Sequence, residues 1–209
     1  VKSDRNIHYI GTDPNTDHTL PDGRTKYHDL AEFYNTRTYR SHNLFPQTNT
    51  FEIYQCGSEE MKNQEGFKKY RGKIDMIFTS PPYFAKEIYS QDAGQSANKF
   101  SSYDLWRDEF LKPTLETAVE WLKPGRFLCW NISDCTFDGK LLPLEADSIK
   151  ILTDLGMIPQ DNLYLVLAQA PGANRVGSSG IPTVKNFCKL NNRFYKTEPI
   201  LVFLKPKSL

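Results

Sequence analysis

The chain has 209 residues, of which 26 are basic and 25 acidic. This length suits one sizeable hydrophobic core rather than two full domains. The balanced charge excludes an overall positive field that would attract a nucleic acid, so any such contact must come from local patches. No apolar run approaches the length that spans a membrane, and no signal peptide is recognisable.

The cysteines and histidines favour neither a disulfide framework nor a metal site. The four cysteines fit no paired metal-ligand spacing: Cys56, Cys129, Cys135 and Cys188. The four histidines all fall in the polar first quarter of the chain, without helical ligand spacing. We therefore expect reduced thiols, a cytoplasmic protein and no bound metal.

The first half of the chain alternates short apolar runs with polar connections. Residues 7–11, 50–55 and 74–78 have the length and residue types of strands. In the connections between them, residues 29–34 are predicted as a short helix and residues 59–70 as helical.

The second half begins with a polar segment, residues 85–102, which we expect to be a mobile loop. Residues 103–122 then show apolar side chains at helical spacing, and Lys123-Pro124-Gly125 is expected to stop that helix. The remaining predicted elements, in chain order, are a strand at 126–132, a helix at 144–155, a strand at 163–167, a long polar loop at 168–197 and a strand at 199–204.

Strands that alternate with helices at this spacing predict an α/β fold with a mostly parallel sheet covered on both faces. The last two strands are joined by a loop without a clear helix, so we expect the final strand to run antiparallel at or near the edge. The whole chain, residues 1–209, is interpreted as a single domain.

The most informative segment is the buried strand 74–78 with the turn that follows it, Ser80-Pro81-Pro82-Tyr83. Prolines cannot continue a sheet ladder, and each restricts the residue before it to extended geometry. The turn is therefore stiff, and it carries a hydroxyl, fixed carbonyls and an aromatic ring at the carboxyl end of a strand, where open α/β sheets bind ligands. A proline-rich loop that merely ends the strand is the alternative.

This strand, the sequence Thr79-Ser80-Pro81-Pro82-Tyr83, the polar segment and the amphipathic helix ending in Leu-Lys-Pro-Gly resemble the amino-methyltransferases of DNA. The resemblance implies a Rossmann-like methyltransferase sheet and methyl transfer from S-adenosylmethionine to an exocyclic amino group of a base, as in restriction–modification. In that family Ser-Pro-Pro-Tyr is most often associated with N4 of cytosine, so we expect that target. N6 of adenine in DNA and bases of RNA or tRNA are the alternatives.

The resemblance also implies roles for the turn. The side chain of Ser80 and a backbone carbonyl of Pro81-Pro82 are expected to accept hydrogen bonds from the target amino group. Tyr83 is expected to stack on a base flipped out of the duplex, with Phe84 as its helper.

Two earlier strand ends are expected to hold the cofactor, together with Thr79 at the end of the third strand. The carboxylate of Asp13 matches the family's acceptor for the ribose hydroxyls, although an Asp-Pro turn is the plain alternative. Gly57, Ser58 and Glu59 resemble the turn that frames the adenine ring. Alternatively, Ser58 or Glu59 is the N-cap or first-turn acid of the following helix.

The polar segments are the candidates for contact with DNA. Residues 168–197 interleave basic and aromatic side chains, a pattern that suits phosphate and base contacts, although a solvated surface loop is the alternative. The candidate basic residues are Lys86, Arg175, Lys185 and Arg193. Asn131 or Asp134, at the end of the fourth predicted strand, lines the pocket or belongs to a turn behind a core tryptophan.

The chain departs from the family at its start. The family's first strand ends in a glycine-rich loop for the methionine part of the cofactor, and no such loop occurs here. We therefore expect a catalytic domain that is partial at its N-terminus, with a missing N-terminal segment or a separate recognition domain as partner. A non-catalytic nucleic-acid-binding protein that kept the fold is a further alternative.

Overall fold

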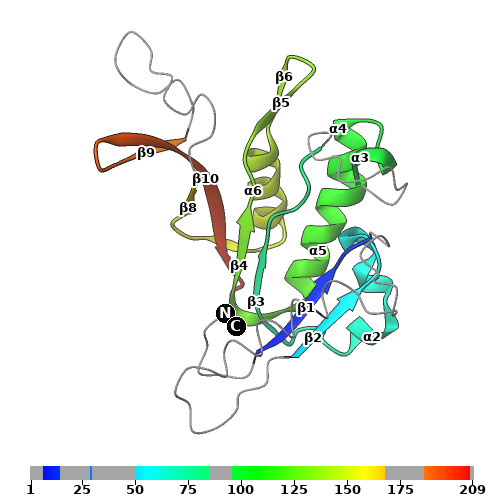
Figure 1. Ribbon diagram of the computed structural model, residues 1–209. Coiled ribbons are helices and arrows are strands. Elements are labelled where there is room, and N and C mark those ends of the chain that lie inside the picture. The colour runs from blue at the N-terminus through cyan, green and yellow to red at the C-terminus, as the bar shows by residue number, and fades with distance from the viewer. Residues whose placement is uncertain (1–6, 15–28, 30–49, 85–95, 168–185, 208–209) are drawn as a thin grey trace, which may run out of the picture.

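The computed structural model describes residues 7–14, 29, 50–84, 96–167 and 186–207 (Figure 1). Most of the predicted helix at 29–34 and large parts of the predicted loops at 85–102 and 168–197 lie outside these residues.

The main sheet consists of β3 (Ile74–Thr79), β4 (Leu122–Asn131), β7 (Ile158–Pro159), β8 (Leu163–Val166), β9 (Phe187–Leu190) and β10 (Arg193–Leu204). β3 and β4 run parallel, and β10 pairs with β4 in the opposite direction. On its other side β10 pairs antiparallel with β7 and β8. The predicted antiparallel last strand is confirmed, one position in from the edge.

A separate parallel pair is formed by β1 (His8–Thr12) and β2 (Thr50–Tyr54), both close to their predicted bounds. Among the described residues no backbone ladder joins β1 or β2 to β3. The continuous sheet expected from the sequence is therefore interrupted between β1 and β3.

The helices are η2 (Ser58–Asn63, a 3-10 helix), α2 (Glu65–Lys68), α3 (Ser96–Lys99), α4 (Tyr103–Trp106), η3 (Arg107–Leu111, a π-helix), α5 (Lys112–Trp121) and α6 (Leu144–Asp154). The predicted helix at 103–122 is thus confirmed as a continuous run with a π-helical segment. Ser102 caps its start by accepting from the backbone N–H of Leu105 at 3.3 Å. The helical region predicted at 59–70 is divided into two short helices.

The main core lies between the sheet and the layer formed by α5 and α6. Leu115 on α5 and Leu152 on α6 are fully buried, as are Leu128 on β4 and Leu201 on β10. Alternate residues of β4 point to this side, because side chains on a strand alternate between the two faces. We call this side of the sheet the covered face.

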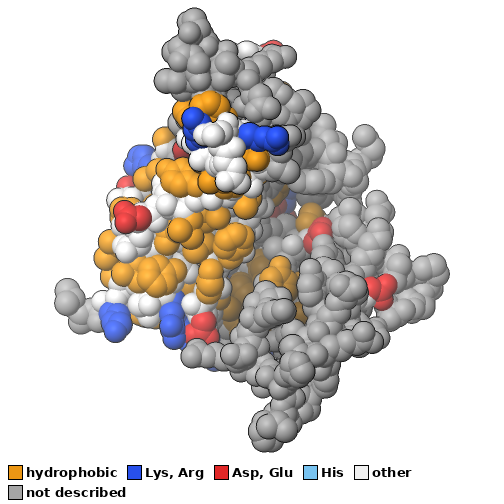
Figure 2. Space-filling model, turned by 60° about the vertical axis from the view of Figure 1, so that its left-hand side comes forward, with side chains coloured by type: hydrophobic (Ala, Val, Ile, Leu, Met, Phe, Trp, Pro, Cys, Tyr) orange, Lys and Arg blue, Asp and Glu red, His pale blue; other side chains and the backbone are white. Residues whose placement is uncertain are grey.

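The opposite side, which we call the open face, is apolar and largely exposed, although Cys129 and Ile200 on it are buried. Met76 and Phe78 on β3 are 57% and 60% exposed, and Phe127, the register partner of Met76 on β4, is 44% exposed. Further exposed apolar residues on this face are Ile158, Leu163 and Leu165. Figure 2 views the molecule from the side of β8 and β10 and shows hydrophobic side chains gathered there. The sequence predicts a sheet covered on both faces, but in the described part of the chain helices cover only one face.

A second, smaller core joins the β1–β2 pair to the end of α5. The rings of Phe67 and Trp121 stack at 5.1 Å, and the indole N–H of Trp121 donates to the carbonyl of Phe67 at 3.1 Å. Ile10 of β1 and Ile74 of β3 pack against this cluster. Apolar packing, rather than a shared ladder, thus links the two sheets.

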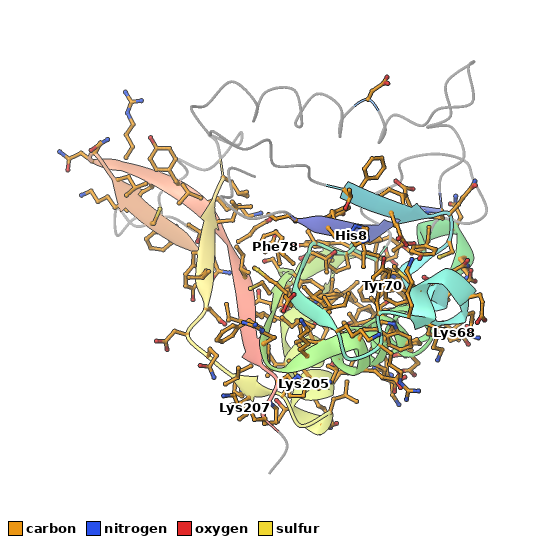
Figure 3. All side chains as sticks on the ribbon, turned by 90° about the horizontal axis from the view of Figure 1, so that it is seen from below. His8, Lys68, Tyr70, Phe78, Lys205 and Lys207 are labelled. Carbon is orange, nitrogen blue, oxygen red and sulfur yellow. The ribbon has the colours of Figure 1, made fainter. Side chains whose placement is uncertain are left out.

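A polar network around Glu52 ties β2 to the chain after α2, and two of its members, His8 and Tyr70, are labelled in Figure 3. Its carboxylate accepts from Tyr54 at 2.7 Å, from Tyr70 at 2.7 Å and from Lys69 at 2.9 Å. The imidazole of His8 on β1 contacts the Tyr70 hydroxyl at 2.9 Å. The hydrogen bonds from Lys69, Tyr70 and Tyr54 lower the pKa of Glu52 to about 2.

Two hairpins were not predicted. In the first, β5 (Cys135–Phe137) and β6 (Lys140–Leu142) are joined by Asp138 and Gly139, with φ of 48° and 72°. In the second, β9 and β10 are joined by Asn191 and Asn192, with φ of 47° and 60°. Positive φ at both central residues matches the hairpin turns that suit twisted strands. The prediction of a loop through residue 197 was therefore wrong for its last part.

The end of α5 also differs from the prediction. The helix stops at Trp121, and Gly125 (φ 75°) lies within β4, where the register with β3 shifts. Lys205, which follows β10, donates from Nζ to the carbonyls of Val119 and Leu122, both at 2.7 Å. Burial lowers the pKa of Lys205. A lysine distant in sequence, rather than a helix-capping glycine, thus satisfies the helix end.

Candidate active site at the strand ends

The proline turn follows β3 directly, as predicted. Thr79 is the last residue of β3, Ser80 is exposed and Pro81 is buried. The buried proline holds the backbone against the protein while the serine side chain faces solvent. The turn therefore leaves Ser80, with its hydroxyl, exposed at the end of β3.

The two aromatic residues of the turn have different surroundings. Phe84 is only 4% exposed and packs against Phe137 at 5.4 Å and Tyr103 at 6.0 Å, measured between ring centroids. Tyr83 is partly buried and packs against the edge of the main core. Phe84 therefore anchors the turn, and its ring is not accessible to a base in this structure.

The ends of β1 and β2 lie side by side. The backbone N–H of Asp13 donates to the carbonyl of Tyr54 at 3.1 Å, and the Thr12 hydroxyl donates to the carbonyl of Cys56. These bonds bring Asp13 next to the turn that begins at Gly57. Two of the regions predicted to hold the cofactor are thus brought together by the fold.

Glu59 is the most unusual side chain of that turn. Its side chain is only 6% exposed, and its Oε1 accepts from Lys99 Nζ at 2.8 Å. Its other oxygen, Oε2, is buried and has no hydrogen-bond partner among the described residues. A Cβ at Gly57 would lie 2.4 Å from Oε2, so a larger residue there would displace the Glu59 carboxylate. An unpaired buried acceptor of this kind is rare in folded proteins.

The alternative roles, in which Ser58 or Glu59 is the N-cap or first-turn acid of the following helix, are confirmed only for Glu59 as a first-turn acid. Gly57, rather than Ser58, occupies the N-cap of η2, and Glu59 lies in the first turn with Glu60. The hydroxyl of Ser58 pairs with that of Thr114 on α5 at 3.1 Å. Ser58 therefore attaches the turn to α5, so its hydroxyl is already engaged.

At the end of β4, the structure gives both candidate pocket residues structural contacts. The buried amide of Asn131 donates to the carbonyl of Pro199 on β10 at 3.0 Å. Asp134 accepts from the N–H of Glu145 at 3.0 Å, and the Glu145 carboxylate accepts from the N–H of Asp134 at 3.1 Å. The second alternative, a turn behind a buried Trp130, fits these contacts.

Among the candidate DNA contacts, Arg193 is exposed at the start of β10, next to the hairpin turn. Phe187 and Phe194 meet edge to face at 5.7 Å on this hairpin, and Lys189 Nζ lies 5.6 Å from the Phe194 ring centre. Lys86, Arg175 and Lys185 lie outside the described residues. The hairpin is on the opposite side of β4 from the proline turn (Figure 1).

The sequence suggested Lys99 only as a residue of the polar segment that could close over the flipped base, and its contact with Glu59 was not predicted. Lys99 lies 40 positions from Glu59 in the sequence, and no local pattern joins the two.

Among the described residues, no group of His, Cys, Asp or Glu is arranged to hold a metal ion, and no helix is long and apolar enough to cross a membrane.

The chain is similar to several known proteins. A family model described as DNA methylase, of the N6/N4 type, matches residues 74–209. The type II methyltransferase M.MjaVI of Methanocaldococcus jannaschii is 37% identical over 83 residues, which make up 40% of this chain and 40% of that protein.

Among solved structures, TTHA0409, a putative DNA modification methylase from Thermus thermophilus complexed with S-adenosyl-L-methionine, matches with a TM-score of 0.46 and 20% identity over 74% of this chain and 55% of that one. The cytosine-N4-specific PvuII DNA methyltransferase matches with a TM-score of 0.40 and 16% identity over 66% and 46%. The chain spans about half the length of these relatives or less.

Proposed function

Because the chain belongs to the N6/N4 DNA methylase family, we propose that it transfers a methyl group from S-adenosylmethionine to an exocyclic amino group in DNA, with N4 of cytosine as the preferred acceptor. The observation that carries this proposal is the exposed Ser80 beside the buried Pro81 at the end of β3. The family match begins at Ile74, the first residue of the strand that leads into this turn.

An exocyclic amino group is a poor nucleophile because its lone pair is delocalised into the ring. The Ser80 hydroxyl and a carbonyl of Pro81-Pro82 accept its two hydrogens, which favours a nitrogen with a localised lone pair and fixes its direction. Tyr83 stacks on the target base, which must leave the duplex to reach the turn. Stacking of this kind contributes about 1–3 kcal/mol per base.

S-adenosylmethionine, when bound, supplies the electrophilic methyl group. The residues at the strand ends fit such a molecule, since Glu59 Oε2 is a buried acceptor without a partner among the described residues. Glu59 would accept from the adenine amino group, and Asp13 would accept from the ribose hydroxyls. Thr79 closes the site from β3, and Ser58 holds the turn against α5.

We assign DNA contacts to the basic residues Lys86, Arg175, Lys185 and Arg193, of which Arg193 is exposed on the hairpin. Basic side chains near aromatic rings suit phosphate and base contacts. In this conformation Phe84 supports the turn from within the core, so Tyr83 is the ring we assign to base stacking.

We further propose that a polypeptide segment beyond the described residues completes the sheet. The support for this is the lack of a partner for the outer edge of β3 among the described strands, together with the exposed apolar side chains of Met76 and Phe78 on the open face. Parallel sheets are normally covered on both faces, and exposed apolar edges promote association. A strand with an attached helix would pair with the edge and cover the face.

The function is tested with the complete gene product, DNA and S-adenosylmethionine labelled in the methyl group. We expect labelled N4-methylcytosine and a loss of about 100-fold in kcat for Ser80→Ala. Ser101→Ala is the matched control, because Ser101 is exposed and has no recorded side-chain contact with the rest of the described chain. N6-methyladenine as the product would refute the cytosine preference. DNA binding without methyl transfer would favour the non-catalytic alternative.

A further inference from the structure

The side chain of Lys99 bridges the two acidic residues of the η2 turn. Its Nζ donates to Glu59 Oε1 at 2.8 Å and to Glu60 Oε1 at 2.5 Å. Glu60 is about half exposed, whereas the Glu59 side chain is nearly enclosed. Burial alone would lower the pKa of Lys99, but the hydrogen bonds to Glu59 and Glu60 outweigh it and raise the pKa, which keeps the ammonium charged.

This bridge determines what the second oxygen of Glu59 can do. Lys99 supplies a positive charge on the Oε1 side and leaves Oε2 as an acceptor without a partner among the described residues. Since Gly57 has no side chain, Oε2 lies against the backbone of the turn. The carboxylate is thereby held in one direction.

Lys99 also connects this turn to the main core. It is the last residue of α3, and the next residue, Phe100, is buried in the cluster that contains Phe84 of the proline turn. Phe100 lies 6.1 Å from Phe110 between ring centroids. The position of Lys99 is therefore fixed by packing that is independent of the acidic residues.

We infer that Lys99 is a positioning residue for the cofactor, which acts by holding the Glu59 carboxylate in one direction so that Oε2 selects an amino group at position 6 of the purine. The inference rests on the proposed function, because it concerns the same cofactor site. It assigns the chain's selectivity for adenine to a charge contributed by α3. An oxygen at position 6 is rejected, since two acceptors would then face each other.

The test measures binding of S-adenosylhomocysteine and of its deaminated analogue, in which hypoxanthine replaces adenine, to the complete gene product. The unmodified protein is expected to prefer the adenine compound by about 100-fold. Lys99→Met is expected to reduce that preference about tenfold, since the Glu59 carboxylate then loses the bond that fixes its direction. Lys99→Arg should retain most of the preference.

Lys62→Met is the matched control, since it removes a lysine from the same turn that has no recorded contact among the described residues. Its preference should equal that of the unmodified protein. If Lys99→Met does not fold, Lys99→Gln removes the charge and shortens the side chain, and the same loss is expected. Unchanged preference in a folded Lys99 variant would overturn this inference alone. Failure of the unmodified protein to bind either compound would overturn the proposed function together with it.

Discussion

The two faces of the main sheet differ most clearly at a pair of consecutive residues on β4. Leu128 is 0% exposed beneath the helices, whereas Phe127, on the other face, is 44% exposed. The sequence of β3, with apolar residues at both even and odd positions, is typical of a strand buried on both sides. The composition of the strands thus suits burial on both faces, and the described helices cover one of them.

The largest effect is expected on the covered face. Leu128→Ala removes a fully buried side chain and leaves a cavity, so we expect the free energy of unfolding to fall by about 2–5 kcal/mol. Urea denaturation measures it. A loss below about 1 kcal/mol would show that the helical layer packs loosely, which would contradict the difference in packing between the two faces.

A smaller effect is expected where α5 meets the end of β10. Lys205→Met removes the donor to the carbonyls of Val119 and Leu122 and leaves them unsatisfied. We expect a loss of about 2 kcal/mol in the same assay. Lys207→Met, with the same change two residues later and no recorded hydrogen bond in the described part of the chain, is the control and should be close to neutral. Equal losses in both variants would contradict a specific role for Lys205.

The β1–β2 pair offers a contrast with the main sheet, because a polar network around Glu52 helps to stabilise it. Glu52→Gln is expected to cost about 1 kcal/mol at pH 7, allowing for partial exposure. The pKa of Glu52 is lowered from 4.5 to about 2 in the folded state, so its stabilisation is complete above pH 4.5 and disappears as the pH falls towards 2.

Denaturation of the unmodified protein and of Glu52→Gln at several pH values measures the difference in their free energy of unfolding. The control is Glu65→Gln, which removes an exposed pair with Lys68 and should change the free energy of unfolding very little. A difference that does not change with pH would contradict the assigned cause.

The smallest effect is expected on the open face. Phe127→Ser should change the stability of the 209-residue chain by about 0.5 kcal/mol, because much of the side chain is already in water. A loss as large as that of Leu128→Ala would show that the face is covered. The comparison would be sharpened further if the same substitution became costly in the complete gene product.

Much of the fold could be predicted because its strands follow simple rules. The strand before Ser80, the amphipathic residues ending at Trp121 and the helix closed by Gly156 were all near their observed bounds. The hairpin turns were missed although Asp138-Gly139 carries a recognisable turn signal. At Asn191-Asn192 the basic and aromatic composition was interpreted as a loop, because the flanking residues do not alternate between apolar and polar.

The candidate site was only partly predictable for a different reason. Ser80 and Asp13 follow strands directly, so their positions could be inferred from local sequence alone. The contacts of Glu59 with Lys99 and of Leu122 with Lys205 depend on how distant segments pack. No spacing rule relates such residues, so a single sequence contains no signal for them.

β10 has a mechanical consequence for the hairpin at its start. It is one continuous strand of 12 residues without glycine, and it is about 40 Å long. Its second half is clamped between β4 on one side and β7 and β8 on the other, while its first half extends to the turn at Asn191-Asn192. Because the strand is continuous, we expect a displacement of that turn to be transmitted along β10 to the centre of the sheet.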